Sequence, residues 1–161
     1  MRSRWQGFAV GLALLAMIAA HAARGEAPDA ESVIADLPRA FVGDFRWDDD
    51  RAIQTVAIRF DTVRRLDAAH VEATGCGVYE TEGRSTAINV RMQVTLPGLA
   101  VEIWEAAPDQ PAFVTDGSHR GSLSGDLRGI EARWTTTATG QQGRLRLEAA
   151  PAARCAPASA T

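Results

Sequence analysis

The sequence predicts an all-β fold: a single antiparallel up-and-down β-barrel or meander sandwich of about eight strands, with a short N-terminal helix. The first observation behind this prediction is that apolar and polar residues alternate in short segments between residues 41 and 149. Such alternation is typical of strands that have one face in the core and one in water. The second observation is that no long helical stretch separates consecutive segments. Parallel strands need such crossovers, so sequential antiparallel hairpins are expected.

The alternation is clearest in Ile88–Leu96, where apolar residues occupy every second position. Leu99–Glu105 repeats the pattern, with its apolar residues also expected on the inner face. In His70–Tyr79, Gly75 and Gly77 interrupt the alternation and indicate a β-bulge or a close approach of two backbones. The other predicted strands are Phe41–Trp47, Ile53–Phe60, Ala112–Thr115, Arg120–Ser124, Ile130–Thr136 and Gln142–Ala149.

Residues 1–22 have the three parts of a secretory signal peptide. Arg2 and Arg4 precede the apolar run Phe8–Ala20, and Ala20-His21-Ala22 is a small-residue cleavage site. The apolar run has 13 residues, and as a helix it would fall short of a hydrocarbon core of about 30 Å. We therefore expect a periplasmic or secreted protein with no membrane span after cleavage.

The remaining chain divides into three parts. Residues 23–40 are expected to form a linker and a short helix at Ala30–Leu37, which ends before Pro38. Residues 41–149 are the predicted β-barrel domain, and residues 150–161 are an Ala/Pro-rich tail.

The charge of the chain excludes one class of partner. All 17 basic residues are arginines and stand against 20 acidic residues, which gives a net charge of -3. Removing residues 1–22 takes away two arginines and no acid, so the exported chain has 15 arginines, 20 acids and a net charge of -5. A basic nucleic-acid interface is therefore not expected.

The two cysteines, Cys76 and Cys155, both lie in the part of the chain that follows the predicted signal peptide. An even number of cysteines in an oxidising compartment favours one disulfide. Such a bridge would hold the tail against the barrel wall. The alternative is two free thiols.

No complete catalytic or metal-binding motif is present, so we predict no catalytic residues, no metal and no cofactor. Two Gly/Ser-rich segments approach the serine hydrolase motif, but His119 and Leu123 stand where the nucleophilic serine belongs. His119 is expected in a solvated loop, far in sequence from His70. Glu102 and Glu105 are an odd number of residues apart, so they should point to opposite faces of their strand.

The candidate ligand-binding residues are aromatic side chains near strand ends and one adaptable methionine: Trp47, Tyr79, Met92, Trp104 and Trp134. An eight-stranded barrel has room for its own side chains or for one small ligand. The alternative is that these residues simply fill the core.

Three short motifs are similar to those of the calycin superfamily, which includes lipocalins and avidins. Gly43-Asp44-Phe45-Arg46-Trp47 resembles the first-strand Gly-x-Trp of lipocalins, with Phe45 at the Trp position. Thr115-Asp116 resembles the start of their second motif, although no Tyr follows. Gly77-Val78-Tyr79 resembles the Gly-x-Tyr that supplies a biotin-contacting Tyr in avidins. The resemblance implies a closed barrel with an interior ligand site, but Asp48-Asp49-Asp50 replaces the avidin Asn and Ser, so biotin is not expected.

Three functions remain open at this point. The first is an exported, non-enzymatic barrel that binds a small apolar or amphipathic ligand in its interior. The second is a periplasmic protein-binding module, an inhibitor or envelope accessory factor, that acts on another envelope protein through its loops. The third is an enzyme without a recognisable motif. Whether the barrel interior is hollow or filled separates the first from the second.

Overall fold

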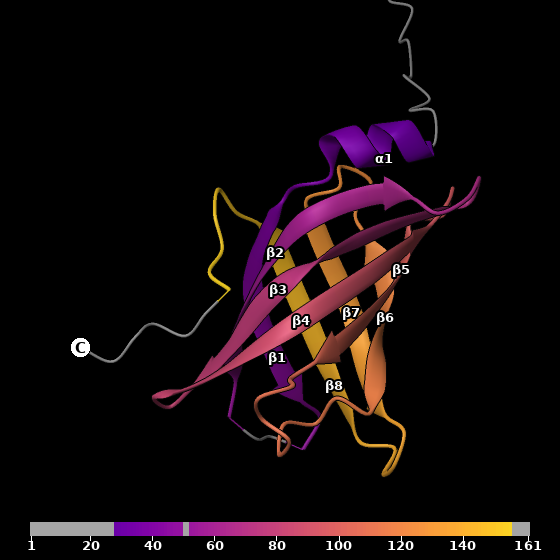
Figure 1. Ribbon diagram of the computed structural model, residues 1–161. Coiled ribbons are helices and arrows are strands. Elements are labelled where there is room, and N and C mark those ends of the chain that lie inside the picture. The colour runs from indigo at the N-terminus through magenta and orange to yellow at the C-terminus, as the bar shows by residue number, and fades with distance from the viewer. Residues whose placement is uncertain (1–27, 50–51, 156–161) are drawn as a thin grey trace, which may run out of the picture.

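The computed structural model describes residues 28–49 and 52–155. Within these residues the chain forms a closed barrel of eight antiparallel strands in sequence order (Figure 1), which confirms the predicted fold class. The last strand pairs with the first, with Phe45 opposite Leu145. The predicted signal peptide and the end of the tail lie outside the described residues.

One short helix precedes the strands, and each strand pairs with its neighbours in the sequence. The elements are α1 (Ala30–Asp36), β1 (Ala40–Trp47), β2 (Gln54–Arg65), β3 (His70–Thr81), β4 (Arg84–Thr95), β5 (Ala100–Ala106), β6 (Gly117–Leu123), β7 (Gly129–Thr136) and β8 (Gln142–Ala149).

The connection between β5 and β6 differs from the prediction. The strand predicted at Ala112–Thr115 is wrong, because residues 107–116 form a loop. Gln110 holds this loop against the barrel, since its side chain accepts a hydrogen bond from the Thr86 hydroxyl (2.8 Å) and donates one to the Ser85 carbonyl (3.1 Å). Strand β6 begins at Gly117, three residues before the start of the predicted strand Arg120–Ser124.

The glycines of β3 mark an irregularity, as the sequence indicated. The pairing of β2 with β3 shifts register between Phe60 and Thr62, so Asp61 is the extra residue of a bulge. A Cβ atom at Gly75 would lie 1.9 Å from the carbonyl oxygen of Arg59, so only glycine allows the two backbones this close. The bulge lets β2 continue to Arg65, beyond the predicted end.

Apolar side chains on the inner faces of the strands fill the barrel over most of its length. The predicted inward residues are buried: Val56, Ile58, Phe60, Ile88, Val90, Met92, Val94, Leu99, Val101, Ile103, Leu145 and Leu147. A one-residue change of register would bring charged and polar side chains such as Arg91, Glu102 and Arg146 inside, so burial fixes the pairing.

Helix α1 lies across one end of the barrel, where β1 begins and β2 ends (Figure 1). Its N-terminus is capped by Asp29, whose side chain accepts a hydrogen bond from the Ser32 backbone N–H at 2.8 Å. Val33 and Leu37 point into the core and are buried. Glu31 accepts a hydrogen bond from Arg65 of β2 at 2.7 Å. The helix therefore closes this end with apolar side chains.

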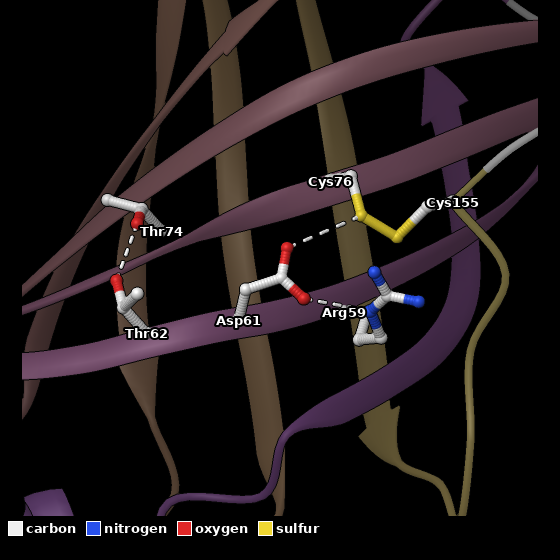
Figure 2. Close-up of polar contacts among 6 residues, drawn as sticks. All are labelled: Arg59, Asp61, Thr62, Thr74, Cys76 and Cys155. Atoms are coloured by element: carbon white, nitrogen blue, oxygen red, sulfur yellow. Dashed lines mark hydrogen bonds and ion pairs between the residues drawn. A yellow bond between two sulfur atoms is a disulfide. The ribbon is translucent and has the colours of Figure 1, made fainter.

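The predicted disulfide between Cys76 and Cys155 is present, with its Cα atoms 5.2 Å apart. Figure 2 shows the bridge on the outer face of β3, beside the ion pair of Arg59 with Asp61. The tail after β8 therefore lies outside the barrel, where Ala152 and Ala153 approach the outward side of β3.

Candidate ligand-binding site

A cavity of about 470 Å³ lies at the end of the barrel opposite α1. Strands β1, β3, β5 and β7 end there, and the β5–β6 loop borders it. The barrel is therefore filled beneath the helix and hollow at its other end. The described barrel is therefore closed at the end that α1 covers and open at the end that holds the cavity.

Aromatic rings form much of the cavity wall. Trp47 and Tyr79 lie edge-on to Phe45, with ring centroids 5.0 and 6.1 Å from it. Phe113, from the β5–β6 loop, packs on the Tyr79 ring at 5.2 Å. Trp134 contributes from β7 and is 2% exposed. Such rings offer apolar contact area in a fixed geometry.

A buried polar cluster interrupts this aromatic wall. The Tyr79 hydroxyl donates a hydrogen bond to Glu105 Oε1 at 2.7 Å. The same oxygen lies 3.1 Å from His119 Nε2, and the Tyr79 oxygen lies 3.4 Å from that nitrogen. These side chains come from β3, β5 and β6, and all three are buried. The barrel thus brings together groups that are far apart in the sequence.

Burial sets the state of the Tyr79 hydroxyl. Loss of water around the side chain raises the pKa of Tyr79 well above its ordinary value, and the charge of Glu105 and the hydrogen bond to it raise this pKa further. The hydroxyl therefore stays protonated at neutral pH and acts as a donor to the carboxylate.

The cluster has unused hydrogen-bonding capacity. Both contacts to Glu105 use Oε1, so Oε2 has no partner among the described residues. Glu105 lines the cavity, and its side chain is 2% exposed. His119 Nδ1 and Trp134 Nε1 are enclosed and have no partner in the described structure. Buried polar atoms normally have partners, so their concentration here makes this cavity the candidate site.

Three of the five candidate ligand-binding residues meet at this cavity, namely Trp47, Tyr79 and Trp134. Met92 is fully buried in the core and does not line the cavity. Trp104 lies on the outer side of β5, where the Arg91 guanidinium stacks on its ring at 4.3 Å. The structure therefore separates Met92 and Trp104 from the cavity.

The expectation of a solvated His119 is wrong, because His119 is 1% exposed. It belongs to β6, where alternation turns it inward between the rings of Phe45 (5.7 Å) and Trp134 (4.7 Å). Glu105 and Phe113 were also missed as site residues. The inner position of Glu105 could have been found, because it has the same parity as Val101 in the same strand.

Glu102 and Glu105 point to opposite sides of β5, as predicted from their spacing. Glu102 lies on the outside, where it accepts hydrogen bonds from Ser118 (2.8 Å) and Arg120 (3.0 Å). Glu105 lies inside with its side chain 2% exposed. The two carboxylates therefore act separately.

Comparison with known proteins leaves the family open. No protein-family model matches the chain, and a search of curated proteins gives no match. The closed eight-stranded barrel is the architecture that the calycin resemblance implies, although other barrel families share it. Within residues 28–49 and 52–155, no helix is long and apolar enough to cross a membrane. The same residues contain no group of three or more His, Cys, Asp or Glu placed to hold a metal ion.

Proposed function

We propose that this protein is an exported, non-enzymatic β-barrel that binds a small amphipathic ligand in the open half of its interior. The observation that carries the proposal is the cavity of about 470 Å³. Small-molecule sites typically have volumes of about 300–1,000 Å³ and combine apolar walls with a few polar groups. The aromatic wall and the buried cluster of Tyr79, Glu105 and His119 have this composition.

The two kinds of wall suit the two parts of such a ligand. Rings of Phe45, Phe113 and Trp134 offer contact to an apolar body. Glu105 Oε2 offers an acceptor to one polar group of the ligand. A purely apolar ligand would leave that carboxylate oxygen desolvated without a partner, which is costly. The geometry therefore favours an amphipathic ligand over an apolar one.

The state of the cluster supports the proposal of binding without catalysis. The raised pKa of Tyr79 keeps its hydroxyl protonated and hence a poor nucleophile at neutral pH. One oxygen of Glu105 is already occupied by the Tyr79 hydroxyl and by His119 Nε2. The proposal is therefore a binding protein.

Export is supported by two independent features. The sequence of residues 1–22 has the parts of a signal peptide. The Cys76–Cys155 disulfide fits an oxidising compartment. We propose a periplasmic or secreted location on these grounds.

Binding to another envelope protein through the loops has weaker support. The large exposed hydrophobic residues of the described chain come from four separate segments: Val42, Ile53, Leu66 and Val114. Leu66 lies at the helix end of the barrel and Val114 at the cavity end. A protein-binding surface would gather such residues into one patch.

A fluorescence titration tests the proposed function. Small amphipathic compounds are added to the purified protein, and quenching of tryptophan fluorescence is recorded. We expect saturable quenching that Trp134→Phe largely removes, because Trp134 lines the cavity. Ala112→Trp is the second variant, since Ala112 also lines the cavity and a larger side chain would fill it.

The outcome is decided by these two variants together. Saturable binding by the wild type that Ala112→Trp abolishes supports the interior site. Binding that persists unchanged in the filled variant would place the ligand elsewhere and contradict the proposal. Absence of binding by every compound would make the loop-mediated function the better one.

A further inference from the structure

We propose that the ligand of this cavity is an organic amine, whose ammonium group pairs with Glu105 and whose apolar body lies against the aromatic wall. This inference rests on the proposed ligand-binding function and adds the chemical class of the polar group. It starts from Glu105, which lines the cavity with a side chain that is 2% exposed and whose Oε2 atom has no hydrogen-bond partner among the described residues.

The neighbours of Glu105 do not cancel its negative charge. The Tyr79 hydroxyl is a neutral donor. His119 donates through Nε2, while its Nδ1 atom is enclosed and has no acceptor. A charged imidazolium would carry a second N–H at Nδ1, and leaving that donor buried without an acceptor is costly. The neutral tautomer with its proton on Nε2 also leaves Nδ1 unpaired, but as an uncharged acceptor, which costs less than an unpaired charged donor. With this tautomer the charge of Glu105 remains for a ligand to neutralise.

The other charged groups of the cavity favour a cation over an anion. Among the described residues, the charged side chains of the lining are Glu82, Arg84 and Glu105, so acids outnumber bases there. Within the described residues no ion pair joins Arg84 to Glu105. A carboxylate ligand would meet like charge at the place where Oε2 needs a donor. The net negative charge of the whole chain also favours a cationic ligand.

Aromatic rings beside the carboxylate add a second attraction for the same group. The Tyr79 and Phe113 rings pack at 5.2 Å, and Phe45 lies 6.1 Å from Tyr79. Faces of such rings attract an ammonium group, and the attraction grows when water is excluded. A buried carboxylate surrounded by aromatic rings therefore matches a cation on an apolar body. A neutral alcohol could also donate to Oε2 but would leave the charge uncompensated.

Isothermal titration calorimetry of three compounds with one body and different head groups tests the inference. The compounds are phenylbutylamine, phenylbutanol and phenylbutanoate, which are cationic, neutral and anionic at neutral pH. We expect the amine to bind at least about tenfold more tightly than the alcohol, and the carboxylate to bind most weakly, because a charge-assisted hydrogen bond is the stronger one.

Two variants of β5 identify the carboxylate responsible. Glu105→Gln keeps the shape and an acceptor for Tyr79 but removes the charge, so the amine should lose at least about tenfold in affinity while the alcohol changes by less than about threefold. Glu102→Gln is the matched control, because Glu102 lies on the outer face of the same strand. It should leave the affinity for the amine unchanged.

Each outcome bears on a different proposal. If the alcohol binds as tightly as the amine, or if Glu105→Gln leaves the affinity for the amine unchanged, the amine inference is overturned while ligand binding stands. If none of the three compounds binds, the amine inference is rejected, and the fluorescence titration with other amphipathic compounds decides the proposed function. If Glu105→Gln does not fold by circular dichroism, the ratio of amine to alcohol affinity in the wild type still decides.

Discussion

Removing the Cys76–Cys155 disulfide should destabilise the barrel strongly without affecting its cavity. The bridge joins positions 79 residues apart. In the chain-entropy model, releasing a loop of this length gives the unfolded state about 15 cal/mol/K, which is about 4.5 kcal/mol at 25 °C. With a urea m-value of about 2 kcal/mol/M, the unfolding midpoint should fall by about 2 M.

The assay is urea unfolding followed by circular dichroism, for the oxidised protein and for the double variant Cys76→Ala/Cys155→Ala. A reductant should lower the midpoint of the wild type to that of the double variant and leave the variant itself unchanged. Because the bridge lies on the outer face of β3 (Figure 2), the folded variant should keep its ligand affinity. A midpoint shift below about 0.3 M would refute the reasoning, since it would mean that the bridge restricts the unfolded chain very little.

Two further predictions concern single positions. The free energy of unfolding should fall as pH rises above about 10, because Tyr79 ionises in the unfolded chain while its raised pKa keeps it protonated in the folded protein. Tyr79→Phe should remove this pH-dependent loss and lower the free energy of unfolding at neutral pH by about 1.5–3 kcal/mol. Because Tyr79 is the only tyrosine of the chain, a spectrophotometric titration of the folded protein reports on this residue alone. Tyrosinate that forms near the ordinary tyrosine pKa would contradict the prediction. Gly121→Ala should cost about 3 kcal/mol or more in thermal or urea unfolding, because its Cβ would lie 1.9 Å from the Glu131 carbonyl oxygen. Gly125→Ala is its control, since nothing lies within 4 Å of that Cβ, and equal effects of the two substitutions would refute the steric explanation.

The barrel could be predicted because its signal is local. In Ile88–Leu96 and Gln142–Ala149 the alternation of apolar and polar residues identifies the inner and outer face of each strand. Short turns between segments mean that each strand pairs with its neighbours in the sequence. The disulfide could also be predicted, because two cysteines in a chain with a predicted signal peptide allow only one intramolecular pair.

The site was predicted less well because it depends on pairing between strands. A strand was predicted only from Arg120 onward, because Gly117–His119 has the composition of a loop; these residues nevertheless belong to β6, where β5 and β7 supply pairing partners on both sides. This pairing turns His119 inward. Trp104 shows the reverse case, since its aromatic character suggested the interior whereas its position in β5 places it outside. The aromatic residues of the sequence suggested a candidate site, but only the strand register shows which side chains line the cavity.

Closure of one end of the barrel by α1 determines how a ligand bound as proposed would be exchanged. Val33 and Leu37 fill the helix end, so in the described part of the barrel the cavity opens at the other end. A bound ligand would then enter and leave through the same opening, and an incoming molecule would have to wait for the occupant to leave. Competing ligands would exclude one another, and departure of the first would limit their rate of exchange.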